Sequence, residues 1–383
     1  MKKRLTLSTL VTACLLAASG VALADINVGV TVSATGPAAS LGIPEKNTVA
    51  LMPKTIAGEK VNYIVLDDAS DTTNGVSNMR KLISENKVDI VLGSSTSPVS
   101  LAMIDVAAET KTPMISMAAS ARIVEPMDDK RKWVFKTPQN DIMMSLAIAE
   151  HMAASGAKTV AFIGFSDAYG EGWLQEFKKA AEAKGAKVVK REFTTNNATD
   201  FMAILTSIKG AKPDVIFYGG MDAQGGPLAK QMQKLGLQAK LLGADGLQSP
   251  EYIKLAGDAA TGTYASSVGM PKDKMPGFKS FNDKYKAKYG EVQIYSPYSY
   301  DATMIVAEAM KRANSTDPAK YAGEIGKTNH NGVTGNIQFD AKGDIKDGAV
   351  TVYQVKDGGW VALETVGGNT PVAAPAPAEE KKQ

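Results

Sequence analysis

Residues 88–98 read VDIVLGSSTSP, and this stretch decides the fold that we predict. Its first part, Val88–Gly93, is almost continuously apolar, as is TVAFIG at Thr159–Gly164. Parallel strands buried on both faces have this pattern, because helices cover both sides of their sheet. The hydroxyl-rich run after Gly93, with Pro98 in it, is typical of a loop that leads into a helix. The stretch therefore predicts one strand-loop-helix unit of an α/β sheet.

The same alternation of short β-branched segments and longer amphipathic segments extends from Asp25 to about Gly269. Such alternation is typical of parallel sheets that are covered by helices on both faces. The predicted strands are Ile26–Val32, Val61–Asp67, Val88–Gly93, Pro113–Met117, Thr159–Gly164, Lys187–Phe193, Asp214–Gly219 and Ala239–Gly243. The predicted helices are Thr73–Asn86, Val99–Thr110, Met144–Ala154, Trp173–Lys184, Asp200–Ile208, Leu228–Leu235, Gly277–Tyr289 and Pro297–Ala313.

The predicted strands fall into two series, which the extended stretch Trp133–Asn140 joins. They predict two doubly wound parallel-sheet lobes. Two later strands, around Gly335–Phe339 and Ala349–Val355, are too few for a third lobe, so we expect them to complete the first two. The chain would then cross between the lobes more than once, through a hinge of several strands. We place the first lobe at residues 25–139 plus 269–346 and the second at residues 140–268 plus 347–366.

The two ends of the chain differ from the part between them. Lys2, Lys3 and Arg4 precede a mostly apolar run that ends in the small-x-small motif Ala22-Leu23-Ala24. This pattern predicts a signal peptide over residues 1–24, cleaved after Ala24, and hence a periplasmic protein. A membrane-spanning helix fits less well, because the run contains Ser and Thr and no basic stop-transfer cluster follows it. Lipoprotein processing at Cys14 also fits poorly, because Val11-Thr12-Ala13 departs from that motif.

Composition narrows the function. The chain has 43 Lys and Arg against 40 Asp and Glu, and residues 1–24 hold three basic and no acidic residues. The exported chain is therefore formally neutral, without the basic excess that nucleic-acid binding needs. Its single cysteine, Cys14, leaves with the leader, which excludes a disulfide, a thiol nucleophile and a thiolate metal site. The Pro/Ala-rich and then charged segment 367–383 predicts a disordered tail.

The loops that follow the strands are the candidate binding site. Ligands of open parallel sheets bind at the carboxyl ends of the strands, where loops lead into helix N-termini. Ser97 suits the N-cap of the helix after Val88–Gly93, and hydroxyls beside exposed helix amides favour a carboxylate. Ordinary helix capping without a ligand also explains this loop. Small residues, Ala118 to Ser120, follow the strand Pro113–Met117 and allow close approach to the backbone.

Seven segments in order carry a family resemblance. They are GVTVSATGPAASLG, VDIVLGSSTSPVSLA, TPMISMAAS, DAYGEGW, DVIFYGG, LLGADGL and GNIQFDAKGD. Together, over residues 25–365, the chain resembles the periplasmic binding proteins of branched-chain amino-acid ABC transporters, which belong to the type I periplasmic binding-protein superfamily. The resemblance implies a receptor that closes two lobes over a small ligand and delivers it to a transporter permease in the inner membrane.

The resemblance also implies site residues. The ligand carboxylate would be held in the first lobe by Ser97, Ala118 and Ser120, with Thr96 beside them. The ammonium would face Asp245. The walls would be formed by Leu41, Tyr169, Met221 and Tyr295.

Five features depart from the family pattern. The acid is Asp245 where Glu is common, and Leu41 and Met221 replace aromatic residues. Arg122 is an additional cation that would suit a second carboxylate or an aromatic acid. The segment Ile43–Asn47 replaces a glycine-rich start of the first helix. We expect an amino acid with an aliphatic side chain, and an aromatic or other organic acid is the alternative.

Other classes of function fit less well. His151 lies in a predicted helix and His330 in an Asn-flanked turn, so neither predicts a metal site. No dinucleotide fingerprint, P-loop or nucleophile elbow occurs, and we therefore expect no catalytic residue, no metal and no cofactor. A periplasmic sensor with the same fold remains an alternative. We expect a monomer whose partners are a small ligand and a permease, without nucleic acid.

Overall fold

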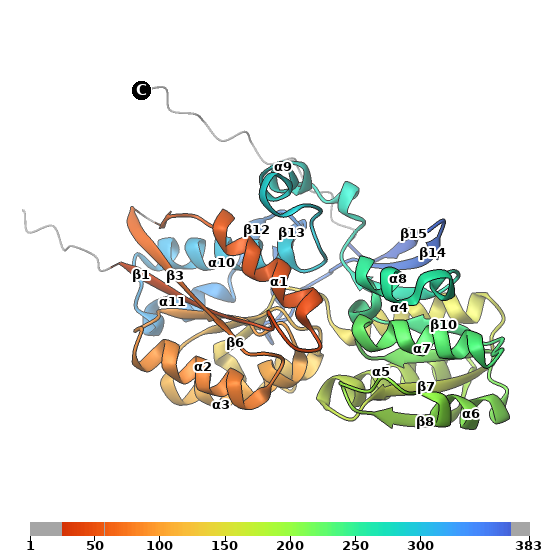
Figure 1. Ribbon diagram of the computed structural model, residues 1–383. Helices are drawn as coiled ribbons and strands as arrows, with labels where there is room; N and C mark the ends of the chain where they lie inside the picture. The colour runs from red at the N-terminus through yellow and green to blue at the C-terminus, as the bar shows by residue number, and fades with distance from the viewer. Residues whose placement is uncertain (1–24, 57, 369–383) are drawn as a thin grey trace, which may run out of the picture.

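The computed structural model describes residues 25–56 and 58–368, in which two α/β sheets lie side by side (Figure 1). The leader predicted over residues 1–24 lies outside the described residues, as does the predicted tail beyond residue 368. In the described ranges, no helix has both the length and the apolar character that crossing a membrane requires.

The first sheet has six strands in the order β2-β3-β1-β4-β5-β6, and it is parallel except for the edge strand β2. Its strands are β1 (Ile26–Val32), β2 (Thr55–Ile56), β3 (Glu59–Asp67), β4 (Ile90–Leu92), β5 (Met114–Ser116) and β6 (Val134–Lys136). Its helices are α1 (Ala39–Thr48), α2 (Thr72–Ser84), α3 (Ser97–Thr110), α10 (Ser296–Ala313) and α11 (Pro318–Ile325). A hairpin of β12 (Asn329–Asn331) and β13 (Asn336–Gln338) and helix α9 (Phe278–Tyr289) complete this half.

The second sheet has seven strands in the order β15-β14-β11-β10-β9-β7-β8. Its strands are β7 (Thr159–Phe165), β8 (Lys187–Thr194), β9 (Val215–Gly219), β10 (Lys240–Gly243), β11 (Tyr264–Val268), β14 (Val350–Lys356) and β15 (Gly359–Val366). Its helices are α4 (Asp141–Ala154), α5 (Ala168–Ala183), α6 (Met202–Ala211), α7 (Asp222–Lys234) and α8 (Pro250–Ala256). Five strands are parallel, and β14 and β15 add an antiparallel edge.

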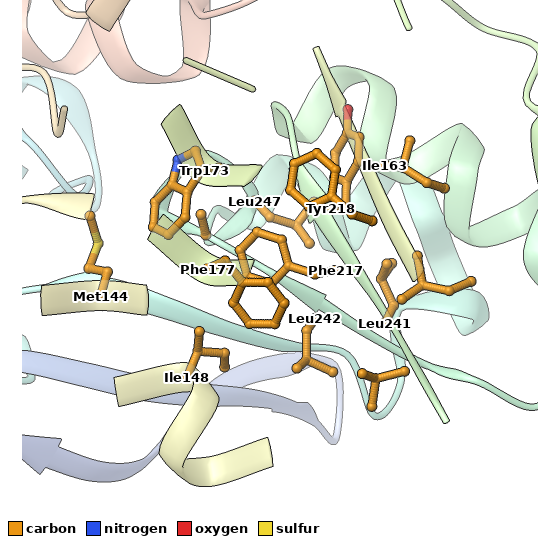
Figure 2. Packing of buried hydrophobic residues seen from close by; sticks show 14 of the residues in the cluster. Met144, Ile148, Ile163, Trp173, Phe177, Phe217, Tyr218, Leu241, Leu242 and Leu247 are labelled. Carbon is orange, nitrogen blue, oxygen red and sulfur yellow. The ribbon is translucent and has the colours of Figure 1, made fainter. Parts of the chain in front are cut away.

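Both sheets are buried on two faces, as the apolar strands predict. In β4, Ile90 packs with β1 and α10 while its neighbour Val91 packs with α2 and α3 on the other face. The second sheet has a more aromatic core. Phe177 of α5 stacks on Phe217 of β9, with ring centroids 3.9 Å apart (Figure 2). The prediction of two α/β lobes is therefore confirmed, although the sheets are mixed at their edges.

The chain passes between the two sheets at three places. The first lies between β6 and α4, the second after β11, and the third before β14. Lys136, at the end of β6, is fully buried and donates hydrogen bonds to the carbonyl of Pro138 (2.6 Å) and to Asp344 Oδ1 (3.2 Å). Asp344 Oδ2 accepts from Asn140 (2.7 Å). A single buried carboxylate thus ties the first crossing to the third.

Candidate functional site

The first group of predicted site residues lies at the carboxyl ends of β4 and β5. Thr96, rather than the predicted Ser97, takes the N-cap position of α3, and Ser97 begins the helix. The Ser97 hydroxyl accepts a hydrogen bond from the backbone N–H of Ser120 (3.3 Å), which joins the two loops. The backbone N–H of Ala118 donates to the hydroxyl of Ser116 (3.1 Å). The structure therefore brings the expected carboxylate-binding loops together, with the amide of Ala118 engaged inside its own loop.

The second group surrounds Asp245, which follows β10. Tyr169, near the start of α5, donates its hydroxyl to Asp245 Oδ1 (2.8 Å). Tyr295, just before α10, donates its hydroxyl to Asp245 Oδ2. Because α10 packs on the first sheet and β10 belongs to the second, this carboxylate links the two halves of the molecule. Three residues that lie far apart in the sequence thus form one hydrogen-bonded group.

The surroundings of Asp245 are unusual for a carboxylate. Its exposed fraction is 2%, and burial raises its pKa, while the hydrogen bonds from Tyr295 and Tyr169 oppose that rise. In the part of the chain that the structure describes, no Lys, Arg or His side chain pairs with it. A buried carboxylate without a cationic partner is costly, and an ammonium group placed against it would remove that cost.

Apolar side chains from both halves close around this group. Leu41 of α1, Tyr169, Met221 and Tyr295 belong to one buried cluster with the core of the second sheet. Thr96, Tyr169 and Met221 also line a small cavity between the halves. Gly246 is required here, because an added Cβ would lie 2.7 Å from the sulfur of Met221 and 2.8 Å from the Tyr169 hydroxyl. Tyr169, Met221 and Tyr295 are therefore assembled around Asp245 and Gly246, and Leu41 belongs to the same buried cluster.

Arg122 is the predicted site residue that the structure does not bring into this group. It lies on a short 3-10 turn, Ala121–Ile123, and its side chain is exposed. Its two neighbours in that turn, Ala121 and Ile123, are buried instead. The predicted cation for a second carboxylate is thus exposed, although its backbone N–H donates to the hydroxyl of Ser120 (3.3 Å).

Glu45 is a site candidate that we did not predict. It lies one helical turn after Leu41 in α1 and is fully buried. Its Oε2 accepts a hydrogen bond from the hydroxyl of Ser95 (2.6 Å), which precedes Thr96 in the first-sheet loop. The sequence shows an acid in an unusual segment that contains Pro44. The burial of this acid, however, depends on the packing of α1 against α10.

Glu45 gives the free energy of unfolding a pH dependence. Burial is the main cause that raises its pKa from 4.5 to about 8. Between those two values the folded chain keeps a proton that the unfolded chain releases, so stability falls as pH rises through this window. The slope approaches about 1.4 kcal/mol per pH unit for one proton. We expect the free energy of unfolding by urea to fall more steeply with pH in the wild type than in Glu45→Gln, by this slope, and parallel curves would contradict the assignment.

A larger cavity, of about 680 Å³, lies elsewhere, between α8, the second crossing and β15. Its lining includes Ile253, Met270, Phe278 and Trp360, and it contains none of the predicted site residues. Because none of the predicted site residues lies there, the Asp245 region is the candidate site. Among the described residues, no group of three or more His, Cys, Asp or Glu side chains is placed to hold a metal ion.

Comparisons with known proteins show the family. A family model described as periplasmic binding protein matches residues 25–359. A Leu/Ile/Val-binding protein from Rhizobium johnstonii is 30% identical over 94% of this chain and 100% of its own length. A Leu/Ile/Val-binding protein homologue from Brucella melitensis is 29% identical over 94% of this chain and 99% of its own length.

Solved structures show the same architecture. An extracellular ligand-binding receptor from Rhodopseudomonas palustris superposes with a TM-score of 0.83 at 35% identity, over 89% of this chain and 100% of that one. A leucine-binding protein from Thermotoga maritima gives 0.84 at 28% identity, over 90% and 99%. A solute-binding protein of an ABC transporter from R. palustris, in complex with 3,4-dihydroxybenzoic acid, gives 0.79 at 26% identity, over 92% and 99%.

Proposed function

The chain belongs to the periplasmic binding protein family, and we propose that it captures a small amino acid and delivers it to an ABC transporter. The observation that carries the proposal is Asp245, a buried carboxylate with two tyrosine hydroxyls and no cationic partner among the described side chains. An α-ammonium group supplies the missing charge, and Ser97 and Ser120 lie on the opposite loops to receive an α-carboxylate. Relatives named for leucine, isoleucine and valine support an aliphatic ligand.

We propose that closure of two lobes traps this ligand. The lobes would be residues 25–139 plus 269–346 and residues 140–268 plus 347–366, with hinges near Pro138–Asn140, Val268–Met270 and Asp344–Gly348. The hydrogen bond from Tyr295 to Asp245 supports this, because it joins the two halves at the site. A ligand that touches both halves binds the closed form better than the open form, and this difference drives closure. The permease would then accept the closed form.

The rest of the proposal concerns location and partners. Export by the leader at residues 1–24, with cleavage after Ala24, would place the receptor in the periplasm beside its permease. The formally neutral exported chain supports a role without nucleic acid. We propose that the protein acts as a monomer and that it is a receptor and not an enzyme, as its family and neighbours are solute-binding proteins.

An aromatic acid is the second candidate ligand. The structural relative in complex with 3,4-dihydroxybenzoic acid favours it, as does the aromatic contact between Tyr169 and Trp173, whose ring centroids lie 6.2 Å apart. Such a ligand has no ammonium for Asp245. The two candidates therefore differ in a single interaction that a substitution can test.

A thermal-shift screen tests the proposed function directly. A ligand that binds only the folded chain stabilises it by mass action, by about 2.7 kcal/mol at one hundred times its Kd. We expect at least one small aliphatic amino acid to raise the Tm of the exported chain by several degrees. A shift with benzoate-type acids alone would select the second candidate. No shift with any amino acid or organic acid would contradict the receptor proposal.

A further inference from the structure

Glu45 has an oxygen atom that the structure leaves without a partner. Its Oε2 is bonded by Ser95, whose hydroxyl in turn accepts from the backbone N–H of Ser33 (3.0 Å). Its Oε1 is fully buried and has no hydrogen-bond partner among the described residues. A buried polar atom without a partner costs stability, and native proteins seldom leave one without a reason. The orphaned oxygen is therefore a candidate contact for a bound molecule.

The position of Glu45 relates it to the candidate site. It shares one face of α1 with Leu41, one of the apolar walls, because residues four apart lie above each other on a helix. Its partner Ser95 belongs to the loop that presents Thr96 and Ser97. On its other side, Glu45 faces Tyr295, whose pKa is raised mainly by burial and by Asp245, with a smaller contribution from the charge of Glu45. Glu45 thus lies between the first-sheet loop and the tyrosine that binds Asp245.

The charged and titratable groups around Glu45 do not satisfy it. Asp68, the residue that follows β3, faces Glu45 as a like charge. Its own carboxylate accepts hydrogen bonds from the hydroxyls of Ser33 and Ser94. From α9, the hydroxyl of Tyr285 is bonded to the carbonyl of Pro44 (3.4 Å). No basic side chain pairs with Glu45 in the described ranges. Since its pKa of about 8 keeps it protonated at neutral pH, its carboxyl offers both a donor and an acceptor.

We propose that Glu45 is a specificity-determining residue, which hydrogen-bonds a hydroxyl group that the ligand carries in addition to its carboxylate. This inference rests on the proposed function and refines it, because Asp245 and the Ser97 loop would already hold the two ends of the amino-acid backbone. Leu41 and Glu45, which share one face of α1, would then contact the side chain of the ligand. A side chain with an apolar body and a hydroxyl end fits this pair, whereas a purely aliphatic one leaves Glu45 Oε1 unpaired.

Ligand pairs that differ by one hydroxyl test the inference. Valine and threonine have the same shape, and the pairs phenylalanine with tyrosine and benzoate with 4-hydroxybenzoate extend the test to aromatic ligands. Isothermal titration calorimetry would give each Kd for the wild type, Glu45→Gln and Glu45→Met. In the pair that binds, we expect the wild type to prefer the hydroxylated member by roughly tenfold or more. Glu45→Gln, which stays neutral and polar, should keep part of that preference, and Glu45→Met should abolish or reverse it.

Lys46→Met is the matched control, because Lys46 is exposed on the same helix. It should leave the preference unchanged, and a thermal melt of each variant would establish that it is folded. Equal affinity for both members in the wild type, or an unchanged ratio in folded Glu45→Met, would overturn the role of Glu45 while leaving the receptor function intact. If none of the six compounds binds the wild type, both the receptor proposal for these ligands and the role of Glu45 are wrong.

Discussion

Asp245→Ala is expected to weaken the binding of an amino-acid ligand by about 30-fold to several thousand-fold. Removing one partner of a buried, hydrogen-bonded charge pair costs 2–5 kcal/mol or more, roughly, because the other charge stays buried and unpaired. Asp245 is 2% exposed, and no cationic side chain pairs with it among the described residues. The ammonium of the ligand would therefore be its ionic partner, and Asp245→Ala would leave that ammonium buried and unpaired. Isothermal titration calorimetry against the best amino acid from the thermal-shift screen would measure the loss.

Asp245→Asn provides the control for this prediction. The amide keeps the size of the side chain, and its oxygen still accepts from one of the two tyrosine hydroxyls, but the negative charge is gone. An amino acid should therefore lose most of the same affinity with either variant. An aromatic acid should bind the Asn variant as well as the wild type or better, because a like charge has been removed. Unchanged binding of an amino acid would show that no ammonium faces Asp245.

The sequence predicts the buried parallel strands well, and the reason is physical. Strand β1 has the predicted bounds, Ile26–Val32. Its nearly continuous apolar run suits a parallel strand that is covered on both faces, and few other local structures bury such a short run. Strand β11, Tyr264–Val268, was missed although it lies between β10 and β14. Its sequence YASSV carries two serines, which are buried by their place in the sheet and not by their own hydrophobicity. Pattern alone cannot predict such a strand.

The site, too, contains residues that were predicted from the sequence and a residue that was missed. Asp245, Tyr169 and Tyr295 were predicted from the family resemblance, and the structure joins them by hydrogen bonds from the two phenols to the carboxylate. Glu45 was not predicted, since α1 contains Pro44 and has no clear apolar face. Its burial follows from the packing of α1 on α10, whose first residues lie some 250 residues away in the sequence, as the contact from the Thr48 hydroxyl to the carbonyl of Ser296 shows (3.5 Å, sequence separation 248). Long-range packing of this kind leaves no local signal.

Lys136→Met is expected to destabilise the folded chain by about 3–5 kcal/mol, the cost of leaving one member of a buried ion pair without its partner. Lys136 is fully buried and Asp344 is 2% exposed, so water does not compensate for the lost charge. Asp344 would keep its hydrogen bonds from Asn140 (2.7 Å) and from its own neighbour Ile345 (2.8 Å), but not its counter-ion. Urea unfolding, followed by circular dichroism, would give the loss from the shift in midpoint and the m-value.

The double variant Lys136→Met with Asp344→Asn separates the charge effect from packing. With both charges removed, most of the loss should be recovered, because replacing a buried ion pair by neutral groups is often close to neutral in stability. A double variant as unstable as Lys136→Met alone would mean that the methylene chain and the bond to the Pro138 carbonyl dominate. Because this pair ties the first crossing to the third, recovery of stability without recovery of ligand affinity would indicate that the ion pair also sets how the two halves close.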